Sequence, residues 1–148
     1  MITRAGRMKI SVGSDHGGFD LKQQVVDFLR QQGHELIDIG CVSLQSVDYP
    51  DFAGRACELV RSGECERGIL ICGTGIGMSI AANRYREIRA ALCHESFTAR
   101  MSREHNNANV LCLGARVIGP ALALDIVGQW LTTEFAGGRH QRRLDMLS

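Results

Sequence analysis

Five short apolar runs alternate along this chain with segments in which apolar residues recur at helical spacing. The expected strands are residues 9–14, 35–39, 68–71, 89–93 and 109–114. The expected helices are residues 19–32, about 51–62, about 78–84, about 96–104 and 120–135, the last with Pro120 at its first position. Strands that are joined one by one through helices form a parallel sheet covered on both faces. The pattern therefore predicts a single Rossmann-like α/β domain, with a five-stranded parallel sheet in the common order 2-1-3-4-5 and a C-terminal helical tail.

The length and charge of the chain indicate how many domains it forms and which partners are excluded. The 148 residues suit one domain, which we expect to span residues 8–148, because Met8 begins the first apolar run and residues 1–7 read as a disordered tail. The 17 basic and 16 acidic side chains give a formal charge of +1, so no overall field attracts nucleic acid or an anionic membrane. No apolar run approaches the roughly 18 residues of a membrane helix, and the opening stretch lacks the apolar core of a signal peptide. We therefore expect a cytoplasmic protein without nucleic-acid or membrane partners.

The chain contains six cysteines, which are Cys41, Cys57, Cys65, Cys72, Cys93 and Cys112. None belongs to a C-x-x-C pair, and most lie in apolar surroundings, where a reduced thiol packs like a small hydrophobic side chain. Neither a disulfide framework nor a zinc site is expected, which agrees with a reducing compartment. We interpret Cys57, Cys93 and Cys112 as buried, inert thiols, whereas Cys72 has a different setting.

Cys72 follows an apolar run and precedes a glycine-rich turn, Gly73-Thr74-Gly75-Ile76-Gly77, after which helical spacing resumes. A thiol there faces a helix N-terminus, whose free N–H groups and dipole favour negative charge on a thiolate or a nearby oxyanion. The turn matches neither the dinucleotide fingerprint G-x-G-x-x-G nor the nucleoside-triphosphate loop. A glycine cluster alone is more typical of a tight turn beside a buried cysteine, so a functional interpretation needs further residues.

Other polar residues also fall at expected strand ends. The first strand ends in Ser14-Asp15-His16-Gly17-Gly18, the fourth in Cys93-His94-Glu95, and the fifth in Gly114-Ala115-Arg116. Open α/β sheets bind ligands outside the carboxyl ends of their strands, and in the expected order the first and third strands are neighbours. Asp15 and His16 alone fit a loop turn and a helix cap, but a crevice shared with Cys72 favours a site.

Several separated motifs together resemble one family. They are Gly13-Ser14-Asp15-His16-Gly17-Gly18, Asp48-Tyr49-Pro50, the run from Gly68 to Gly77, Ser102-Arg103-Glu104-His105-Asn106-Asn107 and Gly137-Gly138-Arg139-His140-Gln141-Arg142-Arg143. From about Met8 to the end of the chain, they resemble ribose-5-phosphate isomerase type B, in a family that also contains galactose-6-phosphate and allose-6-phosphate isomerases. The resemblance implies interconversion of ribose 5-phosphate and ribulose 5-phosphate through a cis-enediolate, with no metal or nucleotide cofactor.

The resemblance also implies roles for individual side chains. Cys72 would be the base that moves a proton between C2 and C1, with Thr74 relaying or orienting that proton. His105 would open the furanose ring, and Asp15 would accept the anomeric proton during opening. The residues expected to bind the substrate are His16, Tyr49, Gly73, Gly75, Gly77, Ser79, Asn106, Arg116, Arg139 and Arg143. Within this set, the main-chain N–H groups of the glycines and of Ser79 would hold the enediolate, whereas His16 and the arginines would bind the phosphate.

Members of the resembled family are dimers whose site is completed by the neighbouring subunit, and some assemble further into tetramers, so a homodimer with interfacial sites is expected. Gly137 and Gly138 are expected to end the last helix and to turn the basic tail back over the pocket. On composition alone, that tail would be a solvated basic segment. Three alternatives stay open, namely a six-carbon sugar phosphate as substrate, a non-catalytic sugar-phosphate sensor, and a redox thiol protein, which would need a resolving cysteine near Cys72.

Overall fold

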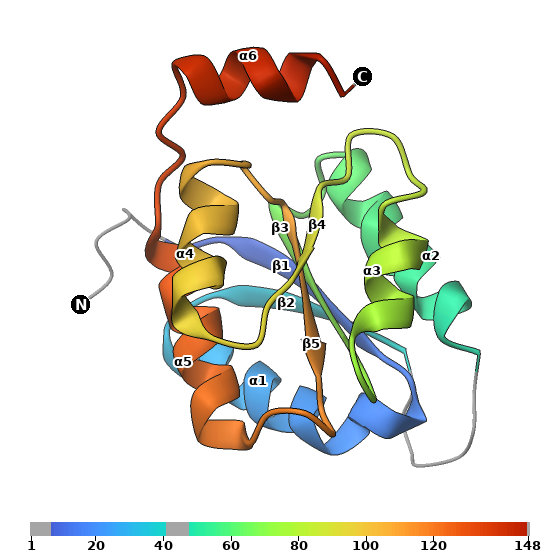
Figure 1. The fold of residues 1–148 in the computed structure, drawn as a ribbon. Coiled ribbons are helices and arrows are strands. Elements are labelled where there is room, and N and C mark those ends of the chain that lie inside the picture. The colour runs from blue at the N-terminus through green and yellow to red at the C-terminus, as the bar shows by residue number, and fades with distance from the viewer. Residues whose placement is uncertain (1–6, 41–47, 148) are drawn as a thin grey trace.

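The computed structural model describes residues 7–40 and 48–147, so residues 1–6 of the expected tail and Cys41 lie outside the described residues. In this part of the chain, five strands form one parallel sheet (Figure 1). The strands are β1 Lys9–Ser14, β2 Glu35–Gly40, β3 Arg67–Cys72, β4 Ala90–Leu92 and β5 Val110–Gly114. The helices are α1 Phe19–Gln31, α2 Tyr49–Arg61, α3 Ile76–Ala82, α4 Ser96–Glu104, α5 Pro120–Thr132 and α6 Arg139–Asp145, and a single 3-10 turn spans His16–Gly18. The predicted α/β class is therefore confirmed.

The order of the last two strands differs from the expected one. The sheet runs β2-β1-β3-β5-β4, so β5 pairs with β3 and β4 lies at the edge. The expected order 2-1-3-4-5 is wrong at this point, because β5 has five fully buried residues and β4 has only three half-buried ones. The longer and more apolar strand occupies the interior, where both of its faces are covered.

The helices cover the sheet on both faces. The chain moves outward from β1 to β2, across to β3, outward to β4 and back to β5. Right-handed crossovers then place α2 and α3 on one face and α1, α4 and α5 on the other, as Figure 1 shows. Each face has its own buried apolar cluster, with Trp130 and Leu111 in one and Leu70 and Met78 in the other. Among the described residues, no helix combines the length and the hydropathy needed to cross a membrane.

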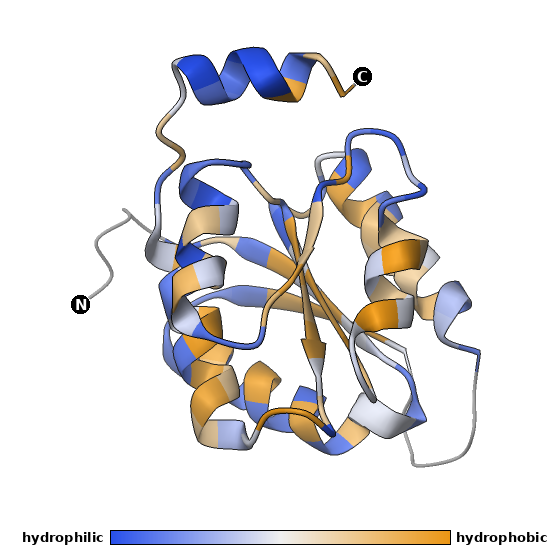
Figure 2. Ribbon diagram, viewed as in Figure 1, coloured by the Kyte–Doolittle hydropathy of each residue, from blue (hydrophilic) through white to orange (hydrophobic). Residues whose placement is uncertain are grey.

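The C-terminal segment departs from the expected path. Helix α5 begins at Pro120 as predicted but ends at Thr132, before the glycines that were expected to end it. Gly137 and Gly138 instead adopt positive φ angles of 68° and 57° at the start of α6. No residue of α6 is buried, and Figure 2 shows it as hydrophilic over most of its length. In Figure 1 this helix stands at the end of the sheet where the strands begin.

Candidate active site

The thiol of Cys72 lies at the carboxyl end of β3, where the chain turns into α3. Only 6% of Cys72 is exposed, and its Sγ accepts a hydrogen bond from the Gly75 N–H at 3.1 Å. Gly75 has a φ angle of +79°, and a Cβ there would lie 2.5 Å from Leu92 Cδ1, so the turn requires glycine. The turn thus aims a main-chain N–H at the sulfur.

Asp15 and His16 begin the loop after β1, directly beside β3. The register pairs Ser14 with Ile71, and the Asp15 N–H donates to the Ile71 carbonyl at 3.3 Å. The nearly buried Asp15 carboxylate accepts from the Gly18 N–H at 3.1 Å through Oδ1. The expected switch point between β1 and β3 is therefore present, because the chain leaves these two neighbours toward opposite faces of the sheet, into α1 and α3.

Glycines allow the two loops to touch. A Cβ on Gly18 would lie 2.6 Å from the Ile71 carbonyl oxygen, a contact that no side chain tolerates. A Cβ on Gly17 would lie 3.4 Å from the Gly73 nitrogen and 3.3 Å from Asp15 Oδ1. The main chain around Gly17 therefore lies against the main chain after Cys72, and the carboxylate and the thiol share one end of the sheet.

Arg116, after β5, and Tyr49, at the start of α2, both contact the glycine-rich turn that follows Cys72. The Arg116 N–H donates to the Gly73 carbonyl at 2.9 Å, and its Cδ, Nε and Nη1 lie 3.5–3.6 Å from the position of a Cβ on Gly73. Tyr49, at the start of α2, packs its ring on Gly77, where a Cβ would lie 2.7 Å from Tyr49 Cζ. A guanidinium and a phenol thus border the thiol turn.

The hydrogen bonds of Thr74 and Ser79 differ from the roles expected for these two residues. The Thr74 Oγ1 accepts from the Ile76 N–H at 3.2 Å, so this hydroxyl is bonded to the first residue of α3. The Ser79 N–H donates to the Gly75 carbonyl at 3.0 Å, and the Ser79 hydroxyl donates to the Ile76 carbonyl at 2.9 Å. The expectation that the Ser79 N–H holds an oxyanion is therefore wrong, because α3 begins at Ile76 and this N–H is already bonded within the helix.

The remaining predicted residues form a second cluster. His105 ends α4, and its ring stacks on that of His140 in α6, with centroids 4.3 Å apart and an angle of 11° between the planes. His105 Nε2 also lies 4.0 Å from Glu104 Oε1. Desolvation, followed by electrostatic interaction with His105 and Arg139, lowers the pKa of His140. Asn106 and α6 border a cavity of about 740 Å³ that also contacts the loop before β4.

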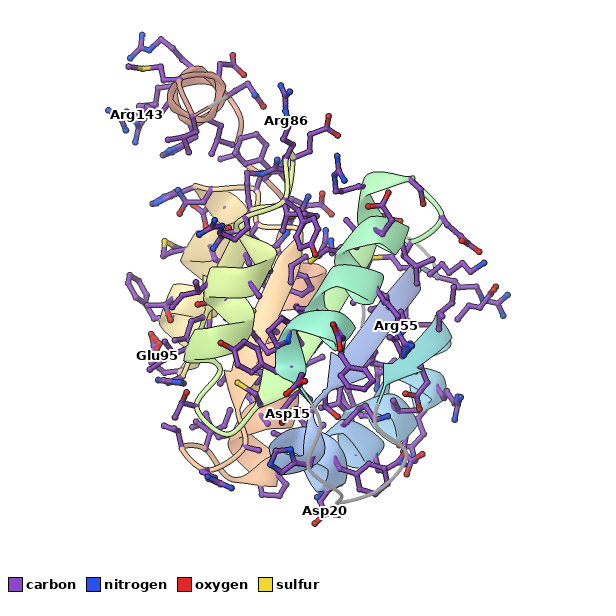
Figure 3. The ribbon with its side chains drawn as sticks, turned by 90° about the vertical axis from the view of Figure 1, so that its right-hand side faces the viewer. Asp15, Asp20, Arg55, Arg86, Glu95 and Arg143 are labelled. Atoms are coloured by element: carbon purple, nitrogen blue, oxygen red, sulfur yellow. The ribbon has the colours of Figure 1, made fainter. Side chains whose placement is uncertain are left out.

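The two clusters lie at opposite ends of the sheet. Cys72 ends a strand, whereas His105 follows a helix and precedes β5, so His105 lies where the strands begin. A strand of six residues such as β3 is about 16 Å long. Figure 3 shows Asp15 and Arg143 at opposite ends of the molecule. The expectation that the tail folds over the thiol turn is wrong within one chain, because α4 ends, and α6 lies, at the end of the sheet where the strands begin.

The other described cysteines behave as inert core residues. Burial raises the pKa of Cys57 to about 12 and also raises the pKa values of Cys93 and Cys112. Cys57 and Cys112 belong to the same buried cluster as Cys72 but are completely inaccessible. The prediction of buried thiols at these positions is confirmed. In the ranges 7–40 and 48–147, no three His, Cys, Asp or Glu side chains are grouped so as to hold a metal ion.

Sequence reasoning assigned no role to Arg103 or His140, although both lie inside the quoted motifs. His140 contacts His105 directly, and Arg103 binds the turn that follows His105. The signal for their importance was their spacing, because each stands within two residues of an assigned residue. Their contacts depend on how α4 and α6 meet, which no local pattern indicates.

An open parallel sheet whose switch point carries a carboxylate, a thiol and a glycine-rich turn defines an α/β enzyme for small polar molecules. The family model described as Ribose/Galactose Isomerase matches residues 10–147, and the chain belongs to that family. The chain is 48% identical to ribose-5-phosphate isomerase B of Escherichia coli, covering 95% of this chain and 94% of that one. It is 46% identical to D-erythrulose-4-phosphate isomerase of Pectobacterium atrosepticum, covering 88% and 87%. The solved structure of Clostridium thermocellum ribose-5-phosphate isomerase B matches with a TM-score of 0.94 and 59% identity, covering 95% of both chains.

Proposed function

We propose that this protein is an aldose–ketose isomerase that interconverts ribose 5-phosphate and ribulose 5-phosphate through a cis-enediolate. The observation that carries the proposal is the convergence of Asp15, the Cys72 thiol and Arg116 on one glycine-lined turn. Membership of the Ribose/Galactose Isomerase family supports the same reaction class. The names of the relatives in Escherichia coli and Clostridium thermocellum support a five-carbon substrate.

In the proposed mechanism, Cys72 removes the proton from C2 of the open-chain sugar and returns it to C1. The Gly75 N–H that bonds to the sulfur stabilises the thiolate between the two transfers. Main-chain N–H groups in the first turn of α3, such as that of Gly77, lack an acceptor within the helix and can hold the enediolate oxygen. Thr74 orients the start of this helix through its bond to the Ile76 N–H.

The proposed site requires two copies of the chain. Ring opening is assigned to His105 and part of the phosphate contact to Arg139 and Arg143, yet these residues lie at the far end of the sheet from Cys72. Only a neighbouring molecule can bring its own His105 cluster to this thiol. We therefore propose a homodimer in which each site combines the Cys72 end of one subunit with the His105 end of the other.

The outward face of α3 supports such a dimer. Ile76 is 51% exposed and Ile80, one turn further on, is 60% exposed, so an apolar stripe faces solvent beside the thiol turn. Helix α3 runs from the Cys72 end of the sheet toward the opposite end. A two-fold axis perpendicular to α3 that pairs this helix with its own copy makes the two helices antiparallel, which places the Cys72 end of each subunit against the His105 end of the other.

The phosphate of the substrate is assigned to cations from both subunits. Arg116 and His16 lie on the Cys72 side, and Arg139 and Arg143 come from α6 of the second copy. Guanidinium groups suit this task because their planar N–H donors match phosphate oxygens in pairs. Helix α6 buries none of its residues against its own chain, which leaves its arginines available to a neighbour.

A substrate panel tests the proposed function. Purified protein should convert ribose 5-phosphate to ribulose 5-phosphate in the presence of EDTA, with a kcat/KM about 10-fold or more above that for allose 6-phosphate or galactose 6-phosphate, since a pocket built for five carbons loses binding when an extra CH–OH must fit. Erythrulose 4-phosphate belongs in the panel because of the Pectobacterium atrosepticum relative. Preference for a six-carbon sugar would replace the substrate but keep the reaction class, and binding without turnover of any of the four would indicate a sensor.

Replacing His105 by alanine should separate ring opening from isomerisation. We expect His105→Ala to lower kcat for ribose 5-phosphate about 10²-fold, because the ring form then lacks its proton donor. Ribulose 5-phosphate has no ring form, since its phosphate occupies the O5 that would close a five-membered ring. Exchange of its C1 proton in D2O, followed by NMR, should therefore stay close to wild type. Equal losses in the two assays would contradict the ring-opening role.

A further inference from the structure

Arg103 is a buried cation next to the second cluster. It is the penultimate residue of α4, and only 6% of it is exposed. Its Nη1 donates to the Ala108 carbonyl at 2.6 Å and to Asn107 Oδ1 at 2.9 Å. Its Nε donates to the Thr133 carbonyl at 3.4 Å. One guanidinium thus joins the turn after α4 to the segment that leads from α5 to α6.

The turn held by Arg103 has an unusual backbone. Asn107 has a φ angle of +47°, a left-handed conformation that costs free energy for a residue other than glycine. Its N–H donates to the Arg103 carbonyl at 3.1 Å, and its own carbonyl accepts from Arg89 Nε at 2.9 Å. The turn that carries His105 and Asn106 is therefore fixed from both sides by buried or half-buried guanidinium groups.

The segment between α5 and α6 is also hydrogen-bonded to the end of α4, next to His105. The Ala136 N–H donates to the Glu104 carbonyl at 3.0 Å, directly before His105. With the Arg103 bond to Thr133, this sets where the chain enters α6, and the stack of His140 on His105 completes the arrangement. The same set of contacts therefore holds His105 and Asn106 in position relative to the arginines of α6.

We propose that Arg103 is a positioning residue for sugar-ring opening: it fixes His105 and α6 relative to each other, so that imidazole and phosphate-binding arginines reach the substrate as one unit. The inference rests on the proposed function. Arg103 itself is buried and does not touch the sugar, so it acts through His105. Lysine cannot replace it, because one ammonium lacks the planar fork that spans the Ala108, Asn107 and Thr133 acceptors.

The test compares Arg103→Lys with Arg67→Lys. Arg67 is a matched control because it is 4% exposed and its Nη1 donates to the carbonyls of Trp130 and Leu131 at the end of α5, not to the turn that follows His105. For Arg103→Lys we expect kcat for ribose 5-phosphate to fall about 10- to 100-fold, as for a catalytic group displaced by about 1 Å. C1-proton exchange of ribulose 5-phosphate at saturation should fall less than about threefold, because Cys72 is untouched.

Arg67→Lys and the NMR signals of the imidazoles distinguish a failure of the positioning role from a failure of the proposed function. Arg67→Lys should lower the melting temperature as much as Arg103→Lys while leaving the ratio of the two activities at its wild-type value. Equal losses of both activities in Arg103→Lys would overturn the inference. In NMR spectra of the imidazole nitrogens, Arg103→Lys should shift the His105 and His140 signals, and Arg67→Lys should shift neither. An inactive wild-type protein would reject the proposed function, whereas unshifted imidazole signals in Arg103→Lys would reject the positioning role.

Discussion

Replacing Cys72 by alanine is expected to lower kcat for ribose 5-phosphate about 10²- to 10⁴-fold, because the proposed general base is lost. The same variant should lose C1-proton exchange of ribulose 5-phosphate to the same extent, since both reactions begin with proton removal by the sulfur. Binding of the sugar phosphate should change little, because the phosphate is assigned to His16 and the arginines. Stopped-time assays of turnover, NMR exchange in D2O and calorimetric titration of substrate measure the three quantities.

The matched control for this thiol is Cys57→Ala. Cys57 is a completely buried cysteine in the same cluster, and burial keeps it in the neutral form at physiological pH by raising its pKa to about 12. Its replacement should lower stability without lowering turnover per folded molecule. Full turnover by Cys72→Ala would remove the thiol from the mechanism, and loss of turnover in both variants would point to a packing defect.

Mixing two inactive variants should restore activity if each site is shared between subunits. Cys72→Ala and His105→Ala, refolded together in equal amounts, should give about a quarter of wild-type activity, since half of the dimers are mixed and one of the two sites in each mixed dimer is intact. Each variant refolded alone should stay at its own low activity. The recovery is a gain from a very low baseline, so a standard isomerase assay detects it easily.

The control for mixing is a pair of variants with both changes on the same end of the sheet. Cys72→Ala mixed with Asp15→Asn should recover activity poorly, because both residues come from the same subunit of each site and lie at the ends of adjacent strands. In that mixed dimer each site carries one of the two defects. Recovery equal to that of the first pair, or a monomer by light scattering, would contradict the shared site.

Local patterns predicted most of the fold and the proximity of Asp15 to the end of β3. Alternating apolar runs placed the five strands and helices α1 to α5 within a few residues, because burial of one face imposes a period that the chain displays directly. Asp15 and Cys72 were brought together correctly because residues at the ends of parallel strands share one edge of the sheet. The order of β4 and β5 was wrong, because periodicity says how a strand is buried but not which neighbour it pairs with.

The contacts that the C-terminal segment makes with α4 could not be predicted in the same way. His105 follows α4 and precedes β5, which in an α/β chain already places it at the end opposite Cys72. Its partners there, His140 and the Arg103 acceptors, come from segments up to 35 residues away in sequence. Such contacts arise from packing of whole elements, and no local propensity encodes them.

By itself, the sequence determined the class of fold, the family and the chemical groups present, since apolar period and ordered motifs are properties of short segments. Only the tertiary structure decided where those groups stand: Asp15, Cys72 and Arg116 at one end of the sheet, and His105 with α6 at the other. The physical reason is that all strands of a parallel sheet run in the same direction. Residues that follow a strand therefore lie at one end of the sheet, and residues that follow a crossover helix lie at the other. Within one chain the two groups therefore stay about a strand's length apart.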